Sequence, residues 1–107
     1  MAETYKKLDQ RAVPNTATTV YTVPSSPSTQ AIVKSIRAVN TSASSATIKI
    51  WQGGTADANV ILPATTIDAG GFAEWEGTMT MAAADYIAAQ ASAATSITMT
   101  INGLEIT

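Results

Sequence analysis

The stretch TATTVYTVPSSPSTQAIVKSIRAVNTSASSATIKIW, residues 16–51, decides the fold class. It contains three runs rich in β-branched and aromatic residues, separated first by a Pro/Ser turn and then by an Asn-Thr-Ser turn. Short runs of this composition, bounded by proline, serine and asparagine, are typical of β-strands. The stretch therefore predicts three strands joined by polar turns.

Alternation of apolar and polar residues predicts which side of two strands faces the core. In residues 46–51 and 96–101 every second residue is apolar, and a slip of one residue would turn these side chains outward. The predicted inward residues are Ala46, Ile48, Ile50, Ile97, Met99 and Ile101. Thr47, Lys49 and Trp51 then lie on the opposite face.

Two other segments are less regular. In residues 32–39 we expect Ile32, Ile36 and Ala38 to face one side, and Val33 and Val39 the other. Glycine inside a strand pattern often marks a bulge, so one is expected at residues 102–103.

Residues 81–94 are rich in alanine, which favours a helix, but they lie between strand-like runs. We predict a turn over 82–85 and a strand over 86–91, with a short helix as the alternative. Val60 to Leu62 reads as a short run ended by Pro63, and Phe72 to Glu76 as a strand that follows a glycine turn. In that strand Glu74 and Glu76 share one face, and Trp75 lies on the other.

About eight short strands at spacings of 8–12 residues predict an all-β chain. The expected fold is a single antiparallel β-sandwich, either jelly-roll-like or immunoglobulin-like. Residues 14–107 form this domain. Residues 1–13 are dense in charge and form an extended N-terminal arm or an edge strand.

Composition excludes several classes of function. The 107 residues include no cysteine and no histidine, which removes thiol chemistry, the usual general base and the commonest zinc ligand. No nucleophile–base pair and no calcium-loop motif is present, so we expect no enzyme, no metal site and no cofactor. The sequon at Asn40 is expected to be only a turn.

Charge is sparse and unevenly distributed. Charged residues make up 13% of the chain, all six basic residues precede residue 50, and six of the eight acids follow it. Either the basic first half and the acidic second half of the chain form different faces of the molecule, or their charges intermingle in the fold. Dispersed cations and a net charge of −2 argue against nucleic-acid binding. No apolar run is long enough for a membrane span or a secretory signal, so synthesis in the host cytoplasm is expected.

Outward-facing basic and aromatic residues are the candidates for contact with a partner, because aromatic residues and arginine are enriched at interface centres. Trp51 is predicted to be outward, either as a protein contact or as a sugar-stacking platform, unless its own Gly53-Gly54 loop covers it. An N-terminal arm could add to a neighbouring sheet, although its charges could equally guard an edge. The candidate interface residues are Tyr5, Lys6, Lys7, Arg11, Lys34, Arg37, Lys49, Trp51 and Trp75.

Several of these runs also resemble a known class of protein. Val20–Pro24, Ala31–Ile36, Asn40–Ser42 and the tail from Ile87 to Ile106 are similar to small β-sandwich structural proteins of tailed-phage virions. One departure is Ala84, because these proteins usually have glycine before the aspartate that corresponds to Asp85.

The resemblance implies a capsid decoration (cement) protein on the outside of the virion. Such a protein binds between subunits of the major capsid protein and is a homo-oligomer, with a trimer favoured. The alternatives are a receptor- or carbohydrate-binding module of a tail fibre or tail tip, and an assembly component of the neck or tail.

Overall fold

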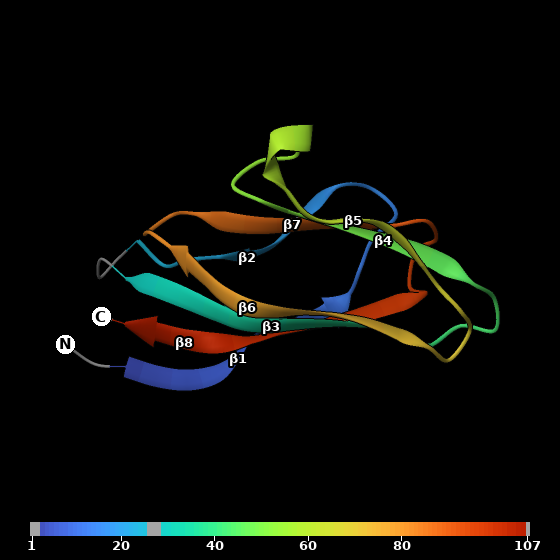
Figure 1. The fold of residues 1–107 in the computed structure, drawn as a ribbon, viewed down its shortest axis with the longest axis horizontal. Helices are drawn as coiled ribbons and strands as arrows, with labels where there is room; N and C mark the ends of the chain where they lie inside the picture. The colour runs from blue at the N-terminus through green and yellow to red at the C-terminus, as the bar shows by residue number, and fades with distance from the viewer. Residues whose placement is uncertain (1–2, 26–28, 107) are drawn as a thin grey trace.

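A computed structural model describes residues 3–25 and 29–106, with side chains from Lys6 onward. These residues form eight strands and one 3-10 turn, stacked as two layers (Figure 1). The elements are β1 (Glu3–Ala12), β2 (Thr18–Thr22), β3 (Gln30–Asn40), β4 (Ala46–Gln52), η1 (Asp57–Asn59), β5 (Val60–Ile67), β6 (Phe72–Met81), β7 (Tyr86–Ala91) and β8 (Ile97–Ile106).

The strands form two four-stranded antiparallel sheets. Sheet A has the order β1-β8-β3-β6, and sheet B has the order β2-β7-β4-β5. The pairs β1–β8, β2–β7, β3–β6 and β4–β5 are nested, as if one long hairpin had wrapped around itself. This is the jelly-roll arrangement. The predicted all-β sandwich is confirmed, and the strand order selects the jelly roll over the immunoglobulin alternative.

The core lies between the two sheets and follows the predicted alternation. Ile48 and Ile50 of β4 face Ile97, Met99 and Ile101 of β8, and each of these side chains is at most 1% exposed. Their burial removes apolar surface from water, which is the main favourable term in folding. The face assignment for these two strands is therefore confirmed.

Strand β3 differs from its predicted pattern because it carries a bulge. Its register with both neighbours shifts between Val33 and Ser35: Lys34 is an extra residue relative to β8, whereas β6 carries the extra residue opposite Lys34. Before the bulge Val33 is buried and Ile32 is only partly buried, whereas Ile36 is buried after it. The expectation that Ile32 faces the core and Val33 faces away was wrong, since the bulge reverses the alternation.

The irregularity expected at Gly103 lies in its neighbours instead. Strand β8 runs through residues 97–106, while β3 shifts at Lys34, opposite Asn102 and Gly103, and β1 shifts at Leu8, opposite Ile101 and Asn102. A Cβ atom on Gly103 would come within 2.1 Å of the Ile32 carbonyl oxygen. Glycine is required here because the backbone of β3 lies too close for a side chain.

Two further expectations concern strand boundaries. Residues 82–85 form a turn closed by the Asp85 amide and the Ala82 carbonyl at 3.1 Å, and β7 follows as predicted, so the helix alternative is not realised. Strand β5, however, does not end at Pro63 but continues to Ile67. Proline is tolerated there because β5 is an edge strand.

Asn40 organises the turn after β3. Its side chain is fully buried and donates to the carbonyl oxygens of Ser44 at 2.8 Å and Ile67 at 2.9 Å, while its Oδ1 accepts from the Ser42 amide at 2.9 Å. These bonds use the amide that a glycan would need. The sequon therefore serves as a turn.

The basic and acidic parts of the sequence intermingle in space. Arg37 of β3 pairs with Glu74 of β6 at 3.1 Å, and Lys6 of β1 pairs with Glu105 of β8 at 2.7 Å. The two halves of the chain contribute strands to both sheets. Of the two alternatives raised by the charge distribution, mixing is therefore the one observed.

Candidate functional site

The outer face of sheet A is the candidate site. Figure 1 shows that the loop carrying η1 rises on the outer side of sheet B, whereas no segment of residues 3–25 or 29–106 crosses the outer side of sheet A. Outward side chains of the four strands stand in rows set by the strand register. From β1 to β6 these rows are Ala12, Thr98, Val39 and Phe72; Gln10, Thr100, Arg37 and Glu74; and Lys7, Asn102, Ser35 and Glu76.

An exposed aromatic residue stands at one corner of this face. The Phe72 side chain is 59% exposed and is the only large hydrophobic residue so exposed within residues 6–25 and 29–106. The Arg37 guanidinium lies 4.8 Å from the centre of its ring, and Glu74 accepts a hydrogen bond from Arg37 Nε at 3.1 Å. The ring and the guanidinium thus form a fixed platform, with the residue types that dominate protein interfaces.

The pKa values of the adjacent Glu74 and Glu76 carboxyl groups are shifted in opposite directions. Hydrogen bonds from Glu76 and Arg37 lower the pKa of Glu74, while the Glu74 carboxylate raises the pKa of Glu76 through a shared hydrogen bond and like charge. Glu76 is therefore the group of this pair that protonates first as the pH falls.

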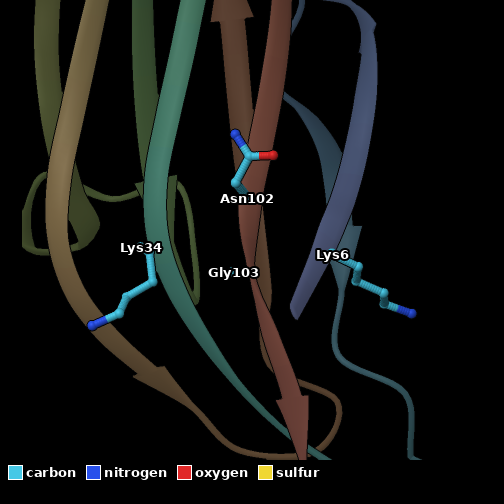
Figure 2. Close-up of a pocket in the computed structure, with 4 residues that line it drawn as sticks. All are labelled: Lys6, Lys34, Asn102 and Gly103. Atoms are coloured by element: carbon cyan, nitrogen blue, oxygen red, sulfur yellow. The ribbon is translucent and has the colours of Figure 1, made fainter. Parts of the chain in front are cut away.

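A shallow depression of about 390 Å³ lies further along the same face (Figure 2). Its lining includes Lys6, Lys34, Asn102 and Gly103, on the three strands that meet at the bulges. The two lysine side chains point away from it in opposite directions, Lys34 toward the Thr78 hydroxyl at 3.2 Å and Lys6 toward Glu105 (Figure 2). The lysines therefore do not converge on a ligand in the depression.

The structure separates the nine predicted interface residues. Lys7, Lys34 and Arg37 lie on the outer face of sheet A. Lys6 and Arg11 lie on edge strand β1 and are paired with Glu105 and Asp9. Tyr5 pairs with Leu104 on the backbone, and its side chain lies outside the described part of the chain.

Both tryptophans lie on the predicted faces of their strands, but neither is an exposed platform. Trp51 does lie beside Lys49 on the outer side of sheet B, but it is 4% exposed and Lys49 Nζ lies 5.3 Å from its ring centre. Trp75 packs against the core, because its partner in the register is the buried Ile36. Neither tryptophan is therefore available as a binding platform. Trp75 lies on the core side of β6, and Trp51 lies on the outer side of sheet B but is almost completely covered.

Phe72 was the residue that sequence reasoning missed. It has the same parity in β6 as Glu74 and Glu76, whose shared outward face was predicted and is observed. This shared parity was the signal in the sequence from which an outward Phe72 could have been predicted. It placed Phe72 on the polar side of its strand, next to Arg37.

Other kinds of site are not found in the part of the chain that the structure describes. It contains no group of three or more Asp or Glu side chains placed to hold a metal ion. None of its residues forms a helix with the length and hydropathy to cross a bilayer. Comparison with protein-family models and with curated proteins gave no match.

Proposed function

We propose that this chain is a non-enzymatic structural protein of a phage virion, a decoration (cement) protein that binds between major capsid subunits on the outside of the head. The proposal rests on the sequence resemblance. The outer face of sheet A is the capsid-binding surface.

The exposed Phe72 is the observation that carries this choice of surface. Phenylalanine and arginine are among the residue types enriched at interfaces, and the Phe72 ring is held in place by Arg37. The neighbouring Val39 adds a second apolar group to its row, and threonine, glutamine and serine supply a polar surround. An apolar anchor with a polar rim is the usual anatomy of a protein interface.

Shell stabilisation follows from mass action. A protein that binds the assembled capsid but not free subunits shifts the equilibrium toward the assembled state. No catalytic group is needed for this. The chain acts as a homo-oligomer, with a trimer favoured by the resemblance, so that several weak faces attach together and gain avidity.

The tail-fibre alternative depended on an exposed tryptophan. Trp51 is covered and Trp75 packs against the core, so no observation favours a sugar platform built on them. An assembly role at the neck or tail is distinguished from capsid decoration by the number of copies of the protein in each virion. Quantitative mass spectrometry of virions should find hundreds of copies for a decoration protein, and at most a few dozen for a neck or tail component.

Binding to capsids tests the proposal directly. Expanded capsids that lack the protein are mixed with purified chain and sedimented, and bound protein is measured across a concentration series. We expect saturable binding that Phe72→Ser weakens by about tenfold or more, because truncating an aromatic anchor residue of an interface typically costs over 1–2 kcal/mol.

Thr66→Ala is the matched control, since Thr66 is an exposed residue of β5 in sheet B. It should bind like the wild type. Absence of binding by the wild-type chain overturns the function. Binding that Phe72→Ser leaves unchanged overturns the assignment of the face.

A further inference from the structure

The two edges of sheet A carry opposite charge. Edge strand β1 has three basic residues and two acids, whereas edge strand β6 has two glutamates and no base. Each strand has a single partner in its sheet, β8 for β1 and β3 for β6. Open edges of this kind present unpaired backbone groups that can pair with another strand.

Within each edge one charge is left without an opposite partner. On β1, Lys6 and Arg11 form ion pairs, whereas among the described side chains, from Lys6 onward, Lys7 contacts the neutral Gln10 at 2.9 Å and has no ion pair. On β6, Glu74 pairs with Arg37, while Glu76 has no ion pair among the described residues. Among the described side chains, Lys7 and Glu76 are therefore the charges of the two edges without an ion-pair partner.

These two residues stand at opposite ends of the same row. Lys7 is opposite Asn102, Asn102 is opposite Ser35, and Ser35 is opposite Glu76. Three strand spacings, about 14 Å, separate the two ends, so the charges cannot meet within one chain. They can meet only where two copies lie edge to edge.

The geometry of the strands supports such a contact. The three neighbouring pairs of sheet A, β1–β8, β8–β3 and β3–β6, are all antiparallel. The edge strands β1 and β6 therefore run in opposite directions. A second copy displaced sideways would therefore place its β1 antiparallel to β6 of the first. With Lys7 placed opposite Glu76, the irregularities at Leu8 of β1 and after Glu76 of β6 fall on opposite sides of this pair, so they do not coincide in the contact.

We propose that copies of this chain associate head to tail, with β6 of one copy pairing with β1 of the next and Glu76 meeting the next copy's Lys7. A symmetric contact of β6 with β6 would instead bring glutamates together. Head-to-tail contacts generate rings when the rotation closes and filaments when it does not. The contact specifies the self-association within the proposed function, but it does not depend on capsid binding.

Charge reversal tests this pairing in the full chain without capsids. Sedimentation equilibrium over a range of concentrations should show association of the wild type that weakens as salt is raised, because the edge charges are exposed. Lys7→Glu and Glu76→Lys should each weaken association by about tenfold or more, since each places like charges at the contact. The double variant, Lys7→Glu with Glu76→Lys, should restore association. A mixture of the two single variants should also associate, because their altered charges are complementary.

Asp68→Lys is the control, an equal change of charge at an exposed turn residue outside both edges. It should associate like the wild type, and circular dichroism should confirm that every variant is folded. A wild type that is monomeric at all concentrations would overturn the proposal. So would single variants that associate normally, or a double variant that stays dissociated. Failure to bind capsids with self-association intact overturns only the proposed function.

Discussion

The Tyr21 hydroxyl donates a hydrogen bond of 2.5 Å to the Glu105 carboxylate, and this contact joins β2 of sheet B to β8 of sheet A. Lys6 of β1 binds the other oxygen of the same carboxylate at 2.7 Å. Burial raises the pKa of Tyr21, and the bond to Glu105 raises it further. Burial alone would raise the pKa of Glu105, but the hydrogen bonds from Lys6 and Tyr21 and the charge of Lys6 outweigh it and leave that pKa lowered.

Tyr21→Phe should therefore destabilise the fold by about 1.5–3 kcal/mol at neutral pH, the cost of losing a hydrogen bond to a charged group. The stability that Glu105 contributes is present above its unfolded pKa, about 4.3, and is lost as the pH falls through the lower folded value. The difference between wild type and variant should accordingly shrink below about pH 4. Above about pH 10 the unfolded Tyr21 ionises before the folded one, so the difference should shrink there too.

Urea unfolding at a series of pH values measures this difference. Tyr86→Phe is the control, since the described structure gives the Tyr86 hydroxyl no hydrogen bond, and its effect should not depend on pH in this way. A pH-independent loss in Tyr21→Phe would show that the hydroxyl contributes packing rather than a bond to a charged partner.

Trp51 provides a second test, through a buried donor. Its indole Nε1 is buried and has no hydrogen-bond partner in the described part of the chain. Trp51→Phe removes this unsatisfied donor and keeps most of the apolar ring, so we expect a change in unfolding free energy within about 1 kcal/mol. Trp51→Ala should cost about 3 kcal/mol or more, because it leaves a cavity. Equal losses in the two variants would indicate that Nε1 does make a bond that the fold needs.

Alternation within single strands was sufficient to predict much of the fold. Ile48 and Ile50 were assigned to the core because their own strand alternates without interruption. Ile32 was misassigned because the bulge at Lys34 arises from pairing with β8, where the backbone around Gly103 allows close approach. A bulge of this kind depends on two strands distant in sequence, so β3 alone did not reveal it.

The candidate site was predicted less well for a similar reason. Arg37 and the outward pair Glu74 and Glu76 followed from composition and parity. Their convergence with Phe72 depends on the β3–β6 register, which the sequence does not specify. Trp51 has the parity of an outward residue, and its burial depends on how the chain folds on the outer side of sheet B.

Gly103 should tolerate no side chain. A Cβ there would lie 2.1 Å from the Ile32 carbonyl oxygen and 3.0 Å from the Val33 Cα, both in the backbone of the central strand β3. Gly103→Ala should therefore cost more than about 3 kcal/mol or prevent folding, as severe steric conflicts in a core do.

Gly77→Ala is the matched control, because its Cβ would make only an ordinary contact of 3.4 Å with the Trp75 ring. Its unfolding free energy should stay within about 1 kcal/mol of the wild type. Wild-type stability in Gly103→Ala would contradict the close approach of β3 and β8.

Ala84 is the position where glycine should improve the protein. It precedes Asp85 in the turn between β6 and β7 and has a φ of 70°, in the left-handed region that disfavours a side chain. This conformation costs a residue such as alanine roughly 1–2 kcal/mol. Glycine avoids that cost but loses about 0.4–1 kcal/mol through the greater freedom of the unfolded chain. The first effect is larger, so Ala84→Gly should raise the free energy of unfolding by about 0.5–1 kcal/mol.

Ala83→Gly separates the two effects, because Ala83 lies in the same turn without a positive φ. It bears only the unfolded-state cost and should lower stability by about 0.4–1 kcal/mol. The two variants should thus move the urea midpoint in opposite directions with the same m-value. If both lowered the midpoint, the turn would not hold Ala84 in the left-handed region, and the strain argument would fail.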